Sequence, residues 1–314
     1  MILEAPDCWR EVRRNPEPAR SVIGDSTAYD SLGNYRPEQS RAEGVLIYRR
    51  AGASYPAMRG TQMHETNARP LPLIGCCGWA GSQAEYISQF PVIEIQSTFY
   101  DPPTSKVAAR WRAISPPDFE FCIKAWQLIT HAASSPTYRR LRRPIDAKRR
   151  AFFGSFQDTD EVWQAWRKTR EIAEAVRATV VLFQCPASFR AIRPNIQNLS
   201  RFFQKLGPQS FRIAWEPRGP WPAEVVRDLC AQYRLIHCVD PLGAAPNCGS
   251  ASYWRLHGKG SYSYRYTNDD LLELKRLLLF APAQPQAYIL FNNIRMKEDA
   301  IRFRVLLDDP RARG

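Results

Sequence analysis

Eight short apolar runs follow one another along residues 71–293, and nearly every run ends in a polar or charged residue. Polar segments of helical length separate the runs. This alternation is typical of a parallel sheet covered by helices, because the strands of such a sheet are buried on both faces. Eight strands are the number that closes a barrel, so we predict an α/β fold, a (β/α)8 TIM-like barrel. The runs read LPLIGCCGW, VIEIQSTFY, FEFCIKAW, ATVVLFQCP, FRIAWEPR, LIHCVDP, SYWRLHG and AYILFNN.

The polar residues that end these runs are the first candidates for a functional site. In barrels of this type the catalytic groups lie at the carboxyl ends of the strands, where the loops to the following helices begin. The candidates at these ends are Tyr100, His131, Gln184, Glu216, Arg218, Asp240, His257 and Asn292.

The phase of each strand predicts which side chains share the barrel interior. Successive side chains of a strand point to opposite faces, so every second residue faces the axis. In the second run this places Glu94, Gln96, Thr98 and Tyr100 toward the axis, and Ile93, Ile95, Ser97 and Phe99 toward the helices. In the other runs the inward set is Cys122, Lys124, Leu182, Gln184, Ala214, Glu216, Arg218, Cys238, Asp240, Arg255, His257, Leu290 and Asn292.

The predicted interior therefore holds charges of both signs. Buried charges are costly unless they are paired, so a purely structural ion network that fixes strand register is one interpretation. A structural network has no reason to prefer the carboxyl ends of the strands, whereas an active site does, and this position favours a site. The charged set comprises Glu94, Glu216 and Asp240 against Lys124, Arg218 and Arg255.

The first 70 residues do not follow the strand pattern. They are rich in Pro, Gly, Ser and Arg and contain one short apolar run, VLIY at residues 45–48. We expect an N-terminal extension over residues 1–70, disordered or loosely packed, followed by a barrel domain over residues 71–314. A translation start placed too far upstream, with Met58 or Met63 as the true start, is the alternative.

Composition agrees with one large soluble domain. Hydrophobic residues make up 44% of the 314 residues, and a barrel of this type needs about 250 residues. The sequence has no run of about 18 apolar residues, so we expect no membrane-spanning segment. The N-terminus MILEAPDCWREVRRNPEP carries charges where a signal peptide needs an apolar stretch, so we expect a cytoplasmic protein.

The formal net charge of +13 is concentrated in the barrel region, and its densest part is YRRLRRPIDAKRR at residues 138–150. A basic loop at the active face of a barrel indicates an anionic partner, either a small molecule or a nucleic acid. Under this interpretation Arg139, Arg140, Arg142 and Arg143 form an anion funnel beside His131. A solvated surface without a partner is the alternative.

A second candidate for anion binding follows the seventh run, in the segment HGKGSYSYRY. Barrels of this type frequently bind phosphate in the loops after strands seven and eight. Gly258 and Gly260 would let backbone N–H groups turn toward an anion, and Lys259 would supply a charge. An ordinary turn is the alternative, because such a short motif is common.

Several strings along the barrel together resemble family 72 of the domains of unknown function, the YecE-like family. They are IGCCGW, IEIQSTFY, FEFCIKAWQLITH, LFQCPASF, AWEPRGPW, YWRLHG with YRY, and FNN, from about residue 73 to about residue 307. The resemblance implies a TIM-like barrel but no established reaction. Gln96 and Cys77 depart from the family, which has Asn and a hydroxyl residue there. The motif positions correspond to Thr98, Phe99, Tyr100, Lys124, Thr130, His131, Gln184, Pro186, Glu216, Arg218, Asp240, Arg255, His257, Gly258, Asn292 and Asn293.

We place first a hydrolase or lyase that acts on a phosphorylated or otherwise anionic substrate at the carboxyl end of the barrel. In it a carboxylate acts as base, a histidine acts as acid, and cations stabilise developing negative charge. The candidate catalytic residues are Glu216, Asp240, His257, His131 and Lys124. The candidate substrate-binding residues are Tyr100, Gln184, Arg218, Arg255, Asn292, Lys259, Gly258 and Gly260.

Two other classes of function remain open. One is a metal-dependent hydrolase of the nuclease type, with a divalent metal on Glu216, Asp240, His257 and His131, although no local metal-binding motif supports it. The other is a noncatalytic nucleic-acid or nucleotide binder that uses residues 138–150. A retaining glycosidase ranks lower, because the cations in the barrel mouth favour an anion over a neutral glycan.

Overall fold

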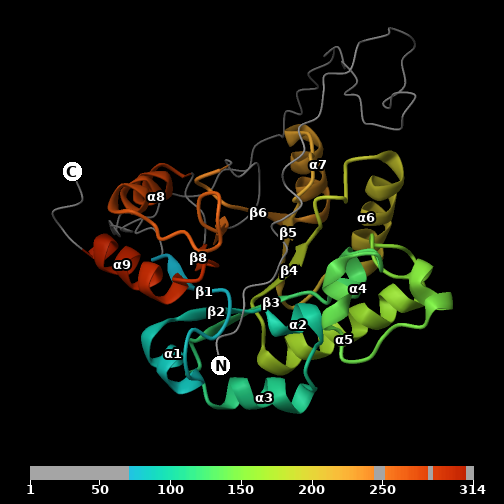
Figure 1. Ribbon diagram of the computed structural model, residues 1–314, viewed down its shortest axis with the longest axis horizontal. Helices are drawn as coiled ribbons and strands as arrows, with labels where there is room; N and C mark the ends of the chain where they lie inside the picture. Colours follow the sequence, from blue (N-terminus) through green and yellow to red (C-terminus); the bar gives the residue numbers. More distant parts are fainter. Residues whose placement is uncertain (1–70, 244–251, 282–285, 309–314) are drawn as a thin grey trace, which may run out of the picture.

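The structure is a computed structural model that describes residues 71–243, 252–281 and 286–308. Its eight strands pair in sequence order, and β1 also pairs with β8 in parallel, so the barrel is closed (Figure 1). The predicted barrel is confirmed, whereas the extension predicted at residues 1–70 lies outside the described residues. The strands are β1 (Leu73–Cys76), β2 (Val92–Ile95), β3 (Glu120–Lys124), β4 (Val180–Gln184), β5 (Arg212–Glu216), β6 (Leu235–Val239), β7 (Ser252–Leu256) and β8 (Ala287–Phe291).

Helices connect the strands and surround the barrel (Figure 1). They are α1 (Gln83–Gln89), α2 (Ser97–Tyr100), α3 (Ser105–Ala113), α4 (Gln127–Thr130), α5 (Asp160–Val176), α6 (Arg193–Leu206), α7 (Ala223–Tyr233), α8 (Asn268–Phe280) and α9 (Met296–Asp308). Two 3-10 helices, η1 (Pro136–Arg140) and η2 (Ala147–Phe152), lie between α4 and α5. Among the described residues, no helix is both long and apolar enough to cross a membrane.

The first turns of several helices are fixed by hydroxyl side chains. The hydroxyl of such a residue accepts a hydrogen bond from a backbone N–H that has no partner within the helix. Ser82, Thr104, Thr159 and Thr267 act in this way before α1, α3, α5 and α8. These caps set where each helix begins, and thereby how long the loop after the preceding strand is.

Buried side chains form one cluster inside the barrel and another between the strands and the helices. The inner cluster includes five residues with the predicted inward phase, Cys122, Leu182, Ala214, Cys238 and Leu290. The outer cluster includes their neighbours along the strands, such as Phe183 and Trp215. Because the alternation continues to the strand ends, the polar residues two positions further along also face the interior.

The second strand is shorter than the sequence predicts. β2 ends at Ile95, and the backbone of Gln96 adopts a helical conformation that begins α2. The alternation holds for Glu94, which is buried in the barrel interior. Phe99, expected to face the helices, instead lies against the amine of Lys124. The prediction for residues 97–100 is wrong because a period of two applies only to extended backbone.

A tyrosine hydroxyl completes the contact between β1 and β2. The register between these strands rests on one pair, Cys76 with Ile93. The hydroxyl of Tyr86 accepts a hydrogen bond from the Cys76 backbone N at 2.7 Å and donates one to the Val92 carbonyl at 2.8 Å. Tyr86 is fully buried, so its hydroxyl satisfies two backbone groups that water does not reach.

The substitution Tyr86→Phe tests this contact. It leaves a buried N–H and a buried carbonyl without a partner, so we expect the free energy of unfolding to fall by about 1–3 kcal/mol, measured by urea denaturation. Tyr233→Phe on α7 is the matched control, because the described residues include no hydrogen-bond partner for that hydroxyl. Equal stability of both variants and the parent would contradict the role of Tyr86.

Candidate active site at the carboxyl end of the barrel

A fully buried arginine, Arg255 on β7, lies at the centre of a charged cluster. Its Nη2 lies 3.0 Å from Glu94 Oε1, and its Nη1 lies 2.5 Å from Glu216 Oε2. Nη1 also donates to Gln184 Oε1 at 3.4 Å. Glu94 accepts a further hydrogen bond from the Tyr253 hydroxyl at 2.7 Å. Each of these buried charges therefore has an opposite charge or a donor beside it, as burial requires.

Glu216, the last residue of β5, extends this cluster toward the solvent. Its Oε1 accepts a hydrogen bond from Arg218 Nε at 2.8 Å, and Arg218 Nη2 donates to His257 Nε2 at 2.5 Å. The backbone N of His257 donates to Asp240 Oδ2 at 3.0 Å, and Nδ1 of the same histidine lies 3.8 Å from that oxygen. The structure thus brings these four side chains together from the ends of β5, β6 and β7.

The protonation of His257 and Glu216 follows from these contacts. A guanidinium only donates, so His257 Nε2 accepts and its proton lies on Nδ1, toward Asp240. Burial and the positive charge of Arg218 lower the pKa of His257, so this ring is neutral at neutral pH. Burial raises the pKa of Glu216, but Arg218 and Arg255 outweigh it and hold this pKa well below its usual range. Glu216 is therefore an ionised anchor for two arginines and a weak base.

Lys124, the last residue of β3, is buried like Arg255 but is not paired with a carboxylate within the described ranges. It is only 5% exposed, yet the described residues place no carboxylate within ion-pairing distance of its amine. Its Nζ lies 3.8 Å from the centroid of the Phe99 ring. Burial and the nearby charge of Arg255 lower the pKa of Lys124 to about 7, against the opposing attraction of Glu216. Both the charged and the uncharged form of this amine are therefore accessible near neutral pH.

His131, directly after α4, lies on the same side of the cluster. Its ring packs edge-to-face on Phe99 with centroids 4.9 Å apart, and its Nδ1 lies 2.8 Å from Thr130 Oγ1. Burial and the charge of Lys124 lower the pKa of His131 to about 3. This histidine is therefore neutral at neutral pH. It does not carry the proton that the acid role predicted for His131 requires.

The exposed fractions of the side chains show which groups face the solvent. The Glu216 and His257 side chains are 8% and 9% exposed, whereas those of Arg218 and Asp240 are 25% and 27% exposed. Arg218 and Asp240 therefore form the outer rim of the cluster, and a ligand that approaches the barrel mouth meets them first.

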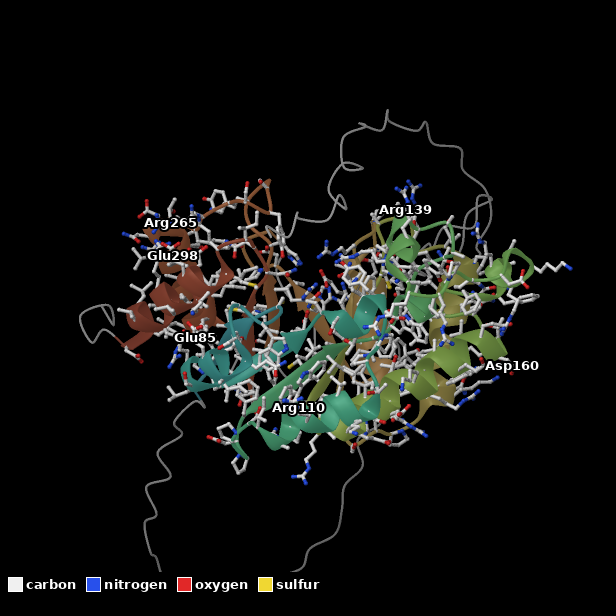
Figure 2. All side chains as sticks on the ribbon, turned by 60° about the horizontal axis from the view of Figure 1, so that its bottom comes forward. Glu85, Arg110, Arg139, Asp160, Arg265 and Glu298 are labelled. Carbon is white, nitrogen blue, oxygen red and sulfur yellow. The ribbon has the colours of Figure 1, made fainter. Side chains whose placement is uncertain are left out.

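The basic loop of residues 138–150 lies next to the cluster. The Tyr138 hydroxyl donates to the His131 carbonyl at 2.7 Å, which fixes the start of the loop. The guanidinium carbon of Arg140 lies 3.8 Å from the Tyr100 ring centroid, so the predicted substrate-binding tyrosine is in contact with the loop. Arg139 is exposed and points away from the body of the protein (Figure 2).

Two donors of the glycine-containing loop after β7, the Gly258 N–H and the Lys259 amine, are engaged within the chain. The N–H of Gly258 donates to the Tyr266 hydroxyl at 2.6 Å, and Lys259 forms an ion pair with Asp270. Gly260 has a φ of +71°, which explains the glycine as a turn residue. The arrangement favours the ordinary-turn interpretation over the phosphate site considered for this loop.

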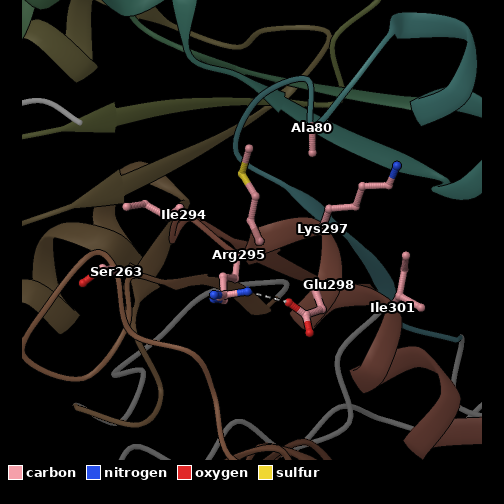
Figure 3. Close-up of a pocket in the computed structure, with 8 residues that line it drawn as sticks. Ala80, Ser263, Ile294, Arg295, Lys297, Glu298 and Ile301 are labelled. Carbon is pink, nitrogen blue, oxygen red and sulfur yellow. Dashed lines mark hydrogen bonds and ion pairs between the residues drawn. The ribbon is translucent and has the colours of Figure 1, made fainter. Parts of the chain in front are cut away.

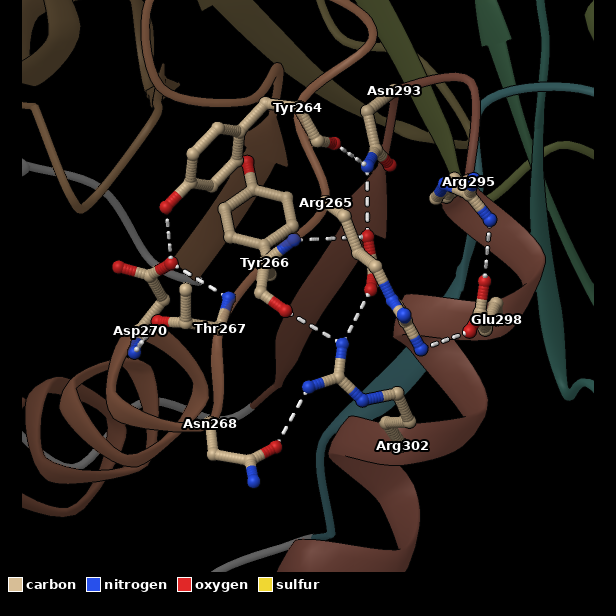
Figure 4. Close-up of polar contacts among 11 residues, drawn as sticks. Tyr264, Arg265, Tyr266, Thr267, Asn268, Asp270, Asn293, Arg295, Glu298 and Arg302 are labelled. Carbon is tan, nitrogen blue, oxygen red and sulfur yellow. Dashed lines mark hydrogen bonds and ion pairs between the residues drawn. The ribbon is translucent and has the colours of Figure 1, made fainter.

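A polar network fixes the same loop to α9 (Figure 4). The Nδ2 of Asn293 donates to Asp299 Oδ2 at 2.8 Å and to the Tyr264 carbonyl at 2.7 Å. Arg302 Nη1 donates to the Tyr266 carbonyl at 2.6 Å and to Asp299 Oδ1 at 2.9 Å. None of these residues belongs to the charged cluster, so the contacts hold the loop in place without taking part in it.

Asn292 and Cys77, two other residues singled out in the sequence, have contacts that give them structural roles. Asn292 is half-buried directly after β8, and its backbone N–H donates to the Leu256 carbonyl at 2.8 Å. Cys77, which departs from the family pattern, is buried in the inner cluster, and burial raises the pKa of its thiol. This thiol therefore stays protonated and is a poor nucleophile.

A separate surface groove with a cavity volume of about 810 Å³ lies beside the start of α9 (Figure 3). Its charged side chains are already paired, Arg295 with Glu298 at 3.2 Å and Lys297 with Glu85. The groove shares no residue with the charged cluster, whose groups lie at other strand ends. The residues that line it are Ala80, Ser263, Ile294, Arg295, Met296, Lys297, Glu298 and Ile301.

The cluster does not fit the metal-dependent interpretation. In the described part of the chain, no group of three or more His, Cys, Asp or Glu side chains is placed to hold a metal ion. The physical reason is that both oxygens of Glu216 face guanidinium groups, one of Arg218 and one of Arg255, where a metal ion would have to lie.

The sequence alone assigns no site role to Glu94 or Phe99, although both lie in the cluster. For Glu94 a signal exists, because a carboxylate between Ile93 and Ile95 in a buried strand needs a buried partner. For Phe99 the strand pattern gives the opposite orientation, and only the family motif points to this residue.

The fold and the cluster define the class of protein. A closed barrel of eight parallel strands, surrounded by helices and with charged groups at its carboxyl end, is a TIM barrel of the kind that enzymes use. The chain belongs to the family described as "Protein of unknown function DUF72", whose model matches residues 73–309.

Similar proteins agree with this assignment. The UPF0759 protein YunF of Bacillus subtilis is 23% identical over 240 residues, which are 66% of this chain and 79% of that protein. The crystal structure of a DUF72 family protein from Enterococcus faecalis is 17% identical with a TM-score of 0.57 and covers 76% of this chain and 98% of that chain. The structure of a DUF72 family protein from Thermotoga maritima is 16% identical with a TM-score of 0.55 and covers 76% of this chain and 100% of that chain. At these identities the two structures show the fold alone.

The substitution Arg255→Met tests the centre of the cluster. It leaves Glu94 and Glu216 buried without their shared cation, so we expect the free energy of unfolding to fall by about 3–5 kcal/mol in chemical denaturation. Arg276→Met is the matched control, because that side chain is 70% exposed and its loss should change stability by less than about 0.5 kcal/mol.

A triple variant separates loss of pairing from loss of packing. Glu94→Gln and Glu216→Gln, added to Arg255→Met, remove the two unpaired charges and should restore part of the lost stability. A single Arg255→Met variant as stable as Arg276→Met would contradict the central role of Arg255.

Proposed function

We propose that this chain is an enzyme that acts on a small anionic substrate at the carboxyl end of the barrel. The observation that carries this proposal is the position of Arg218, a partly exposed guanidinium at the rim, with four exposed arginines of the basic loop beside the barrel mouth. Burial and the charge of Arg218 both contribute to the lowered pKa of Lys124, His131 and His257. An anion bound to Arg218 offsets this charge, and the exposed arginines attract such an anion from solution.

The cations of the cluster take two different roles in this proposal. Arg218 is partly exposed, so it binds the anionic group of the substrate, while the amine of Lys124 stabilises negative charge that develops during the reaction. Arg255 is fully buried between two carboxylates and therefore holds the strand ends together without touching the substrate. Of the two arginines predicted to bind the substrate, Arg218 keeps that role in this proposal and Arg255 does not.

Asp240 is the base in this proposal, in preference to Glu216. Its oxygens accept backbone N–H groups of Leu242 at 3.2 Å and of His257 at 3.0 Å, and its side chain is partly exposed. Lys124 takes the acid role predicted for the histidines, because a group with a pKa of about 7 exchanges protons at neutral pH. A hydrolase and a lyase both fit these roles.

The substitution Arg218→Gln tests the anion site. We expect binding of pyruvate and of inorganic phosphate, measured by isothermal titration calorimetry at low salt, to weaken at least about tenfold, which corresponds to about 1.4 kcal/mol. Arg276→Gln, a distant and exposed replacement on α8, should leave binding unchanged. Equal affinities for the parent and the Arg218 variant would contradict the proposal, and so would the absence of binding by the parent.

Nucleic-acid binding by the basic loop is the second candidate function. The observation in its favour is that Arg139, Arg140, Arg142 and Arg143 are all exposed on one loop beside the barrel mouth. Clustered exposed cations bind phosphate backbones without sequence preference and in a salt-dependent way. Phe153 and Phe156, which follow this loop, are buried in the outer core cluster and therefore do not offer rings on which bases could stack.

Replacing Arg139, Arg140, Arg142 and Arg143 together by Ser tests this second function. We expect affinity for single-stranded and duplex oligonucleotides to fall and its dependence on salt concentration to flatten, measured by fluorescence anisotropy. The melting temperature and the affinity for pyruvate should stay near those of the parent. If the quadruple variant binds nucleic acid as well as the parent at low salt, the loop is an ordinary solvated surface.

A further inference from the structure

We propose that Lys124 forms a covalent imine with the carbonyl group of its substrate. This inference rests on the proposed function and narrows it: the substrate is an anionic carbonyl compound, either a 2-oxo acid or a phosphorylated aldehyde or ketone. Arg218 binds the anionic group, as in the proposed function, whereas Lys124 reacts through its uncharged amine with the carbonyl carbon instead of acting as an acid.

The position of Lys124 differs from that of the other well-placed lysines. Lys259 and Lys297 form ion pairs with carboxylates, which keep an amine protonated. Lys124 is buried at a strand end with the Phe99 ring below its amine, and the described residues place no carboxylate within ion-pairing distance. A lysine acts as a nucleophile only through its uncharged amine, and burial beside other cations favours that form.

The charged neighbours of Lys124 come from three strands, β2, β5 and β7. They are Glu94 on β2, Glu216 on β5, Arg218 after β5 and Arg255 on β7. The two carboxylates raise the pKa of the amine, but each is already bound to Arg255. The two arginines and burial lower this pKa, and His131 beyond α4 adds no negative charge because it is neutral. The balance therefore favours a reactive amine.

Imine formation at Lys124 needs no oxidant, reductant or metal. The lone pair of Nζ attacks the carbonyl carbon, the carbonyl oxygen takes up a proton, and a carbinolamine forms. The amine then loses its second proton, the hydroxyl leaves as water, and a C=N bond replaces the C=O bond. Water carries the proton from the amine to the departing oxygen, and Arg218 keeps the anionic group in place.

Reductive trapping tests the inference directly. The full chain is incubated with pyruvate or with glyceraldehyde 3-phosphate in the presence of sodium cyanoborohydride, and the modified residue is located by peptide mass spectrometry. We expect one predominant adduct on Lys124, formed at least about tenfold faster than on any other lysine. The rate should reach half its maximum near pH 7, because the uncharged amine is the reacting species, whereas solvated lysines react at a pH near their usual pKa of about 10.4.

Two variants define the controls. Lys124→Met replaces the amine by an apolar side chain of similar length that still packs against Phe99. It should abolish the rapidly formed adduct. Lys106→Met removes an exposed lysine on α3 and should leave the fast adduct unchanged. Circular dichroism and the melting temperature establish that each variant is folded. If Lys124→Met does not fold, competition by inorganic phosphate in the parent supplies the second readout, since phosphate on Arg218 should slow trapping at Lys124 only.

The outcomes separate this inference from the function on which it rests. If pyruvate binds and Arg218→Gln weakens that binding, but no lysine is trapped preferentially, the imine is wrong and the anion site stands. If Lys124 is trapped equally fast by neutral propanal and by pyruvate, the imine stands and the anionic substrate is wrong. Labelling of Lys124 at the rate of exposed lysines, with half-maximal rate near pH 10, overturns the inference.

Discussion

The rest of the site depends on one interaction, the contact of the buried Arg255 guanidinium with two carboxylates from opposite parts of the barrel. Glu94 on β2 and Glu216 on β5 lie 3.0 and 2.5 Å from its nitrogens. Burial lowers the pKa of Arg255, but the two carboxylates outweigh it and raise this pKa well above its ordinary value. Three strands that are far apart in the closed sheet are thereby joined at one level of the interior.

This contact also determines what the neighbouring groups do. Because Arg255 binds one oxygen of Glu216, the other oxygen is left for Arg218, which in turn reaches His257. Protonation of Glu216 at low pH would break both contacts at once. Its lowered pKa therefore stabilises the folded barrel at and above the usual carboxyl pKa, and this contribution is lost as the pH falls toward the folded-state pKa.

The barrel fold and most of the residues of the charged cluster could be predicted from the sequence. Both follow from simple periodicities: apolar runs that mark strands, and alternation that sends Glu216 and Arg255 to the same side. The alternation no longer applies after Ile95, because the backbone becomes helical there. The orientation predicted for Phe99 is wrong for this reason. The pKa values of the site residues could not be predicted from the sequence. The pKa of His131, for example, depends on its burial and on the charge of Lys124, which only the folded structure brings close to it.

The contrast between Arg255 and Lys124 explains why we propose a chemical role for the lysine. Both are buried cations at the carboxyl end of the barrel, and both would be costly if left charged and alone. A guanidinium keeps its proton, so Arg255 offsets the cost of burial by pairing with carboxylates, and this pairing fixes the strands. A lysine amine can instead avoid the cost of a buried charge by losing its proton. The carboxylates that would keep Lys124 protonated are already paired with Arg255. The structural ion network and the reactive amine that we propose are therefore compatible interpretations of this cluster, because the network engages the carboxylates that would otherwise pair with the amine.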